Sequence, residues 1–293
     1  MRIGHIINSV NVPEDSDLGR AQPVTFKTLL RSKSISKYKD SIEHYVVGYE
    51  GDYDHVPSGF VHLPELERSV LDVGKFNVQR KLPLIGDIFN SIDGQVDLDW
   101  IVYSNVDIAV MPYFYDYLFD HLKRVDSTRC LVINRRVVEE VPEGLLSSYY
   151  SQVGKRHPGF DCFVIPMSLI SKFNLDLVCL GGNFLGRAIL CNLYSFADEV
   201  KILEDSHLTF HIGDDGAWLN RVNSEFDTHN KECIYRLIDS LAKDVDNHRL
   251  EELEMVRSFL DYWDTGPPIP FLRKLRYKFT SAMRLLTSPF CNA

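Results

Sequence analysis

The sequence predicts an α/β protein with a mainly parallel, Rossmann-like sheet flanked by helices, followed by a helical C-terminal extension. Short apolar runs alternate with segments of helical periodicity across the first two thirds of the chain, which is typical of a parallel sheet covered on both faces. The chain has 293 residues, of which 45% are hydrophobic and 25% charged. This length and composition suffice to bury a sizeable core without disulfides or a structural metal.

The expected strands are short apolar runs bounded by turn formers. The first, residues 2–10, precedes an acidic stretch, and the second, 43–49, ends at a Glu-Gly-Asp turn. Residues 100–104 form the clearest strand. The other expected strands are 60–63, 130–133 and 160–166, and residues 200–210 are expected to be extended.

The expected helices are segments whose apolar residues recur at helical spacing. The first spans residues 21–30 and has Pro23 near its start, where proline is tolerated. Residues 81–91 place Leu82, Ile85, Ile88 and Phe89 on one face. The remaining helical segments are 112–122, 186–196 and 230–263.

The chain divides into three predicted units. Residues 1–225 carry the α/β pattern, residues 226–265 form a helical, acidic extension, and residues 266–293 form a basic amphipathic tail. From Phe271 onward the tail has five cations and no acid, interleaved with apolar residues at roughly helical spacing. Such a helix can lie on an anionic membrane surface. The alternative is an ordinary terminal helix that packs on an acidic domain.

Composition excludes several classes of protein. The net charge of −9 argues against a nucleic-acid binder. No apolar run approaches the ~20 residues of a membrane span, and the amino terminus lacks the h-region of a secretory signal. The six cysteines form no CxxC pair, which favours buried, reduced thiols. We therefore expect a cytoplasmic protein, with contact at the inner face of the membrane through the tail.

The strongest local signal is the sequence Tyr103-Ser104-Asn105-Val106-Asp107, at the end of the clearest strand. Ligands of parallel sheets bind beyond the carboxyl ends of the strands, and this rule brings Asn8 and Ser9 to the same edge. Alternate residues point the same way, so Asn105 and Asp107 could converge on Mg²⁺ or Mn²⁺, which would neutralise a diphosphate leaving group. The alternative is an Asx turn that caps the next helix.

Two further clusters offer acid–base or metal chemistry. His211 follows a predicted strand and precedes Asp214 and Asp215, which suits a metal ligand or an acid–base group. A capping loop would use the same residues. Asp161 opens an apolar strand, where a carboxylate is costly unless it is exposed or paired, and its alternative role is that of a turn residue.

Basic residues near these segments could neutralise a diphosphate. Arg80 and Lys81 precede the predicted helix at 81–91, and Arg187 follows a glycine-rich segment that matches neither the dinucleotide-binding spacing nor a P-loop. The alternatives are a solvated basic pair for Arg80 and Lys81 and a structural ion pair for Arg187.

Taken together, these motifs resemble nucleotide-sugar glycosyltransferases of the GT-A fold, and most of all a bacterial group of uncharacterised GT-A-like members. The resemblance covers roughly residues 1–220 and rests on four motifs in order. They are Tyr103–Ile108 (Y-x-N-x-D-I), Gly159–Val164 (G-F-D-x-F-V), the Gly186-Arg187 helix start, and His211 close to the two Asp residues.

The resemblance implies a GT-A-like catalytic domain over residues 1–225. It places Asn105 and Asp107 at the "DxD" motif that holds the metal and the diphosphate, and His211 in the metal shell. It also implies that the first strand and its loop, with Asn8 and Ser9, hold the base and ribose. Asp161, Asp214 and Asp215 would face the sugar and the acceptor.

Asn105 departs from the family pattern, because it replaces the first acid of the motif. A neutral ligand weakens metal binding, and a metal-independent site would need Arg80, Lys81 or Arg187 to neutralise the leaving group.

The leading hypothesis is a glycosyltransferase that moves a sugar from a nucleotide-diphosphate donor to a hydroxyl of a glycan or lipid-linked acceptor. If the reaction inverts configuration, a carboxylate must accept the acceptor's proton, and the candidates are Asp214, Asp215 and Asp161, in that order. The alternative is a binding module that keeps the nucleotide-sugar or glycan cleft without catalysis. A nucleotidyltransferase ranks lower, because residues 10–20 lack a glycine-rich basic loop.

Overall fold

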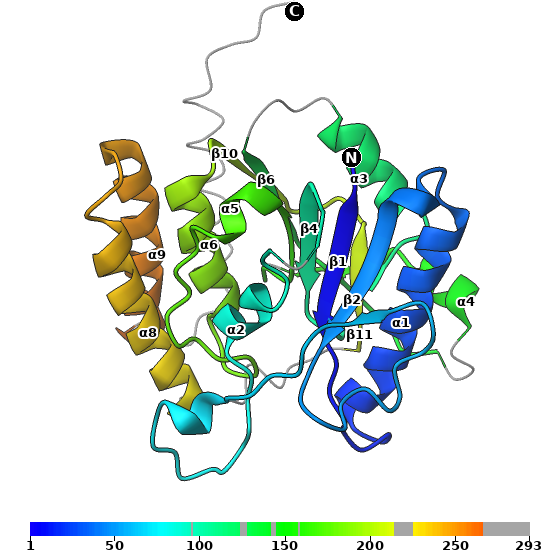
Figure 1. Cartoon of the computed structure of the whole chain (residues 1–293), viewed down its shortest axis with the longest axis horizontal. Coiled ribbons are helices and arrows are strands. Elements are labelled where there is room, and N and C mark those ends of the chain that lie inside the picture. Colours follow the sequence, from blue (N-terminus) through cyan, green and yellow to red (C-terminus); the bar gives the residue numbers. More distant parts are fainter. Residues whose placement is uncertain (95, 124–127, 142–144, 158, 214–224, 266–293) are drawn as a thin grey trace, which may run out of the picture.

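The computed structural model describes residues 1–94, 96–123, 128–141, 145–157, 159–213 and 225–265. A central sheet is covered by helices on both faces (Figure 1). Its strand order is β10-β6-β9-β4-β1-β2-β3. The bounds are β1 (Ile3–Asn8), β2 (Ile42–Val47), β3 (Val61–His62), β4 (Trp100–Ser104), β6 (Arg129–Ile133), β9 (Cys162–Pro166) and β10 (Glu199–Leu203).

The predicted mainly parallel sheet is confirmed, with one reversed strand. β9 runs antiparallel to both of its neighbours, β4 and β6, whereas all other pairs in this sheet are parallel. An apolar run such as 160–166 shows that a strand is buried but not which way it runs. The direction of β9 therefore depends on contacts that are distant in the sequence.

A second, four-stranded sheet has the order β5-β11-β7-β8. Its strands are β5 (Ala109–Val110), β11 (Thr209–Ile212), β7 (Arg136–Val138) and β8 (Lys155–Arg156). The single extended segment expected at 200–210 is wrong in this respect, because β10 and β11 belong to different sheets. A turn that includes His207, whose φ is 48°, separates the two strands.

Two helices, α1 (Asp17–Ile35) and α3 (Phe114–Leu122), cover one face of the central sheet. The predicted start of α1 is four residues late, because Ser16, not the proline, caps the helix by accepting from the Gly19 N–H. Pro23 lies inside α1. α4 (Leu146–Tyr150) packs on the second sheet, where Tyr149 contacts Phe210.

The opposite face of the central sheet is covered by the C-terminal helices and two short ones. They are α2 (Ile85–Asn90), α5 (Met167–Ile170), α6 (Leu185–Phe196), α8 (Glu225–Leu241) and α9 (Asn247–Thr265). The helical C-terminal region is therefore present. Short 3₁₀ turns, η1 (Lys39–Ser41) and η2 (Val70–Asp72), complete the described elements. No described helix is both long enough and apolar enough to cross a membrane.

Candidate functional site

Three connections between the two sheets leave the central sheet at the same edge. The chain passes from β4 to β5 through residues 105–108, from β6 to β7 through Asn134 and Arg135, and from β10 to β11 through residues 204–208. Because β4, β6 and β10 run in the same direction, these connections all start at the carboxyl edge. β9 runs the other way, so Asp161, which precedes it, enters at that edge too.

The Asn105–Asp107 turn is partly exposed at this edge, since Asn105 and Asp107 are half-buried while Val106 is buried. Its backbone is closed by the Ile108 N–H, which donates to the Asn105 carbonyl at 3.0 Å, and it is tied to Asp161, whose carbonyl accepts from the Asn105 N–H at 3.4 Å. The Tyr103 hydroxyl donates to Asn105 Oδ1 at 3.3 Å. The Asp107 side chain keeps 27% of its surface exposed, so a ligand can reach it.

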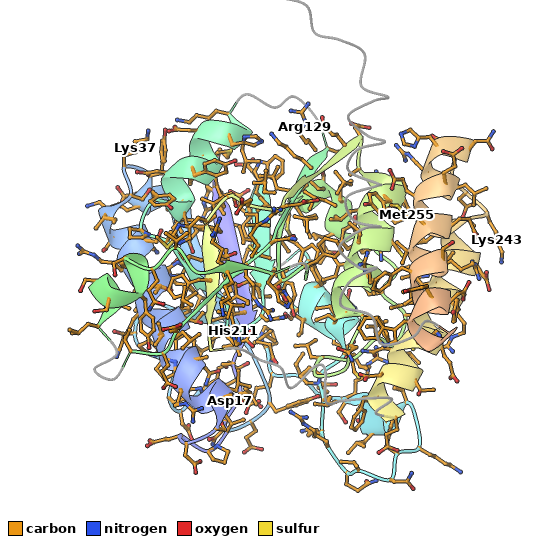
Figure 2. All side chains as sticks on the ribbon, turned by 180° about the vertical axis from the view of Figure 1, so that it is seen from behind. Asp17, Lys37, Arg129, His211, Lys243 and Met255 are labelled. Atoms are coloured by element: carbon orange, nitrogen blue, oxygen red, sulfur yellow. The ribbon has the colours of Figure 1, made fainter. Side chains whose placement is uncertain are left out.

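Pairing between β5 and β11 brings His211 to Asp107. Phe210 pairs with Ala109 in an antiparallel register, which carries His211 past the end of β5 to the turn that holds Asp107. The resulting distance from His211 Nε2 to Asp107 Oδ2 is 3.4 Å. Figure 2 shows His211 at the same end of the sheet as Asp17, the first residue of α1. Two residues that are far apart in the sequence therefore form one acid–imidazole pair.

The second imidazole nitrogen of His211 constrains this pair. Nδ1 lies 3.2 Å from the Gly213 carbonyl oxygen, an acceptor that requires an N–H on Nδ1. A neutral ring would then turn the lone pair of Nε2 toward the Asp107 carboxylate. The contact is favourable only if the ring is an imidazolium or if a cation lies between the two groups.

The electrostatics of Asp107 agree with a cationic neighbour. Burial disfavours the charged carboxylate, but the contact with His211 and the charge of Arg135 outweigh burial and hold the pKa of Asp107 below its ordinary value. Its other oxygen, Oδ1, is buried and has no hydrogen-bond partner within the described part of the chain. A carboxylate with an unpartnered oxygen beside an imidazole fits a group that ligates a divalent cation, with the imidazole as second ligand.

The third ligand that a metal site needs is not found here. Within the described ranges, no group of three or more His, Cys, Asp or Glu side chains is placed to hold a metal ion. Asp214 and Asp215, the nearest acids in the sequence, lie outside the described residues.

Asp161 forms a buried ion pair with an arginine that the sequence analysis did not identify. The distance from Arg135 Nη1 to Asp161 Oδ1 is 2.7 Å, and their side chains are 6% and 11% exposed. His157 approaches the other carboxylate oxygen at 3.9 Å. The signal that could have found Arg135 is its place two residues after an apolar strand, close to the position that Asn105 occupies after β4.

The loops after β1 and β2 are held together by one carboxylate. Asp52 accepts from the Asn11 N–H at 2.8 Å and from the Tyr49 N–H at 2.9 Å. Asn8 is the last residue of β1 rather than a loop residue, and its amide donates to the Val47 carbonyl at 2.8 Å. Ser9 is fully buried, so a nucleotide at this edge would meet the backbone of the loop rather than that hydroxyl.

The predicted basic residues lie in two places. Lys81 Nζ lies 3.7 Å from the ring centroid of Tyr49, which places this exposed cation, next to Arg80, beside the loop after β2. The Arg187 guanidinium packs 3.9 Å from the Phe259 ring and 4.7 Å from the Phe160 ring.

The start of α6 lies close to the residues before β9. At the preceding glycine, Gly186, a Cβ would lie 2.6 Å from the Phe160 carbonyl oxygen, so only glycine permits this approach. Arg187 therefore lies against Phe160, the residue that directly precedes Asp161.

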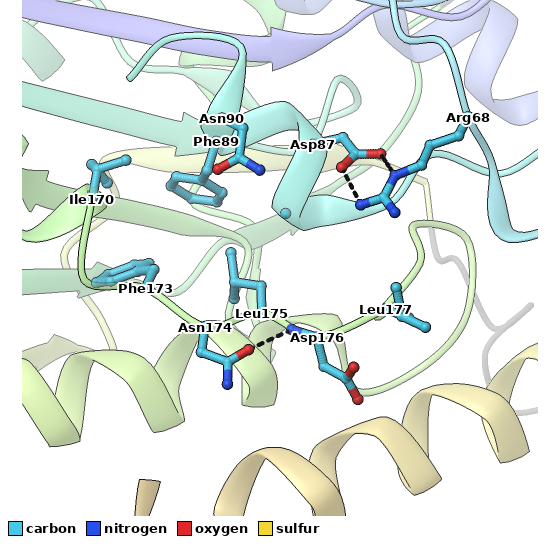
Figure 3. A pocket seen from close by; sticks show the side chains of 11 residues that line it. Arg68, Asp87, Phe89, Asn90, Ile170, Phe173, Asn174, Leu175, Asp176 and Leu177 are labelled. Atoms are coloured by element: carbon cyan, nitrogen blue, oxygen red, sulfur yellow. Dashed lines mark hydrogen bonds and ion pairs between the residues drawn. The ribbon is translucent and has the colours of Figure 1, made fainter. Parts of the chain in front are cut away.

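A pocket of about 220 Å³ lies apart from this edge, between α2 and residues 170–177 (Figure 3). Its carboxylate Asp87 is paired with Arg68 at 2.7 Å, and the Asn174 side chain accepts from the Asp176 N–H at 3.1 Å. None of the predicted site residues lines this pocket. The candidate site is therefore the strand edge.

Some predictions remain untested by the structure. The tail at 266–293 lies outside the described residues, so its predicted contact with a membrane stays a prediction. Five of the six cysteines are described, and all five are buried and free, as predicted: Cys130, Cys162, Cys179, Cys191 and Cys233.

Comparison with known proteins identifies the fold. No protein-family model and no curated protein matches the sequence. Among solved structures, the chain is similar to S. aureus TarS 1-349, with a TM-score of 0.51, 11% identity, and coverage of 86% of this chain and 70% of that one. A complex of TarS 1-349 with UDP-GlcNAc matches with a TM-score of 0.51, 10% identity, and coverage of 89% and 72%. The predicted GT-A-like fold is thereby confirmed.

Proposed function

We propose that this protein is a glycosyltransferase that moves a sugar from a nucleotide-diphosphate donor to a hydroxyl of a glycan or lipid-linked acceptor. The observation that supports this function best is the Asn105–Asp107 turn at the carboxyl edge of a GT-A-like sheet, with Asp107 held against His211. Because TarS has been solved with UDP-GlcNAc, we propose UDP-GlcNAc as the first donor to test.

Because the leaving group is a nucleoside diphosphate, the protein would accelerate transfer mainly by positioning the reactants and stabilising the negative charge that develops on the diphosphate. Asn105 Oδ1 already accepts from Tyr103, and the side-chain NH₂ group of Asn105 makes no hydrogen bond to any described residue. An amide can therefore donate to a phosphate oxygen, where a carboxylate would repel it. Lys81, Arg80 and Arg187 are the proposed cations around the donor.

Mn²⁺ or Mg²⁺ is proposed as a cofactor on the basis of the His211–Asp107 geometry. Asp107 and His211 would hold the ion, which would neutralise charge on the diphosphate. The competing reading is a His211 imidazolium that faces Asp107 without a metal. Isothermal titration of Mn²⁺ separates the two, since only the first predicts binding that His211→Ala abolishes.

Asp214 and Asp215 remain the first candidates for the base that accepts the acceptor's proton. Asp161 ranks third because its carboxylate is paired with Arg135, and a carboxylate that is paired with a guanidinium is a weak proton acceptor. We propose that residues 266–293 hold the enzyme near a membrane-bound acceptor, which sedimentation with anionic vesicles tests by comparing the full chain with a chain that ends at residue 265.

The decisive test is Asp107→Ala, assayed for sugar transfer and for donor binding. We expect transfer to fall by about 100-fold or more, as for the loss of other groups that stabilise transition-state charge. Asp97→Ala is the matched control, because Asp97 is an aspartate at the opposite end of β4 whose side chain is 98% exposed. Unchanged transfer and donor binding in Asp107→Ala would contradict the proposal.

A non-catalytic binding module is the alternative, and Asn105 favours it because a neutral residue stands where the motif has its first acid. This alternative predicts that wild-type protein binds UDP-GlcNAc in calorimetry, with or without Mn²⁺, but neither transfers nor hydrolyses the sugar.

A further inference from the structure

Four fully buried polar side chains form a hydrogen-bonded chain through the interior of the central sheet. His5 comes from β1, His44 from β2, Tyr115 from α3 and Ser104 from β4, and none of the four residues has exposed surface. Buried polar groups of this kind are costly unless each finds a partner.

The contacts link the four residues in series. His44 Nε2 lies 2.9 Å from the Tyr115 hydroxyl, which lies 2.9 Å from His5 Nδ1, and His5 Nε2 lies 2.9 Å from Ser104 Oγ. The Tyr115 hydroxyl has one proton, so it donates to one imidazole and accepts from the other. The tautomers of the two histidines are therefore coupled through Tyr115.

Burial keeps this chain neutral. It lowers the pKa of His5 to about 3. The pKa of His44 also falls well below its ordinary value, first through burial and then through the neighbouring His5 and Lys33. Both imidazoles contact hydroxyl groups, whereas His211 contacts a carboxylate.

The hydrogen-bonded series of side chains ends at Ser104, the residue before the candidate site. Ser104 is the last residue of β4, and the next residue is Asn105. Successive residues of a strand face opposite sides, so Ser104 is held on the α3 side while Tyr103 is held on the α2 side, where it contacts Phe89 and donates to Asn105. Two buried anchors, one on each face, thus fix the point where the turn leaves the sheet.

We propose that His5 is a positioning residue for the Asn105–Asp107 turn: its hydrogen bond to Ser104 fixes the end of β4, and Tyr115 and His44 hold the imidazole in the tautomer that makes this bond. The inference rests on the proposed function, because the turn is the proposed diphosphate site. His5 itself does not touch substrate in this arrangement. It acts through Ser104.

The test compares Ser104→Ala with Ser195→Ala. Ser195 is a matched control because it is also buried and its hydroxyl donates to the Cys191 carbonyl at 2.8 Å, within α6. We expect similar shifts of the unfolding midpoint in both variants. We expect kcat to fall about tenfold in Ser104→Ala only, with a smaller change in donor KM, because small misplacements of catalytic groups cost this much or more.

Tyr115→Phe tests whether the effect travels along the chain. It removes the hydroxyl that holds His5 and keeps the ring, so we expect it to lower kcat as Ser104→Ala does. The double variant should be no slower than the slower single variant, because both changes break the same connection. Equal kcat values in Ser104→Ala and Ser195→Ala, or additive losses in the double variant, would overturn the proposal.

An NMR experiment separates this proposal from the proposed function. With selectively ¹⁵N-labelled histidine, we expect His5 to remain neutral and in one tautomer between pH 5 and pH 8. The backbone amide signals of Asn105 and Asp107 should shift in Ser104→Ala and Tyr115→Phe but not in Ser195→Ala. If wild-type protein neither binds nor turns over a nucleotide-sugar, the proposed function fails while these shifts still support the anchor. If the Asn105 and Asp107 signals do not move in Ser104→Ala and Tyr115→Phe, the positioning role of His5 is overturned.

Discussion

Two buried polar clusters lie within the same fold, and they differ in the kind of partner that each buried polar group has. At the strand edge, Arg135 pairs with Asp161 and His211 contacts Asp107, so each carboxylate has a basic partner. In the interior, the hydrogen bonds of His5 run to the hydroxyl groups of Tyr115 and Ser104. Burial alone therefore does not decide whether a group is charged. The partner decides, since the pKa of Asp107 falls despite burial whereas His5 stays neutral.

The largest effect is expected from Arg135→Ala. This change leaves the Asp161 carboxylate buried without its guanidinium, and breaking a buried pair typically costs about 3–5 kcal/mol. Urea unfolding at pH 7.5 measures the loss of unfolding free energy. In the double variant Arg135→Ala/Asp161→Asn the loss should be smaller than in Arg135→Ala, because no unpaired charge remains. A loss below about 1 kcal/mol in the single variant would mean that the edge tolerates an unpaired charge.

An intermediate effect is expected from pH, through the interior cluster. The folded-state pKa values of His5 and His44 are depressed, so their contribution is complete above the unfolded-state value of about 6.5 and is lost as pH falls toward the folded value. With up to about 1.4 kcal/mol per pH unit for each histidine, the unfolding free energy should drop by about 2–3 kcal/mol between pH 7.5 and pH 5.5. Asp107, whose pKa is also lowered, adds its loss only below about pH 4.

His44→Phe sharpens this prediction. It removes one of the two titrating groups and keeps a ring that stacks on Phe60, so the pH dependence of the unfolding free energy should become shallower. Equal stability of the wild-type protein at pH 7.5 and pH 5.5 would contradict the neutral interior cluster.

The smallest effect is expected from Asp97→Ala. Asp97 and Arg2 form an ion pair at 3.2 Å, but their side chains are 98% and 52% exposed. An exposed pair of this kind contributes about 0–1 kcal/mol. The unfolding free energy should therefore change by less than about 0.5 kcal/mol, which would show how much the environment separates this pair from Arg135–Asp161. A loss comparable to that of Arg135→Ala would remove the contrast.

The sequence predicted the elements of the fold better than their arrangement. Residues 100–104 were predicted as a strand and form β4, because a continuous apolar run leaves few alternatives. The same kind of signal marked β9 but could not give its direction, and it merged β10 with β11. Helix ends depended on single residues, such as Ser16, whose capping role is visible only when its side chain meets the Gly19 N–H.

The candidate site was predictable where one residue follows a strand and unpredictable where two residues must meet. Asn105 and Asp107 follow β4 directly and were identified. Arg135 was missed because its partner, Asp161, is brought to it by the reversed strand. Contact between His211 and Asp107 depends on the register of β5 and β11, two short strands that periodicity does not resolve.

The reversal of β9 also bears on how this site could change over evolutionary time. The segment that leads into β9, rather than the one that leaves it, borders the candidate site. His157, Gly159 and Phe160 precede β9, so substitutions at these residues would remodel the rim while the strand pairs of β9 with β4 and β6 stay in register. Variants that alter substrate choice without loss of folding should therefore be sought first in that entering segment.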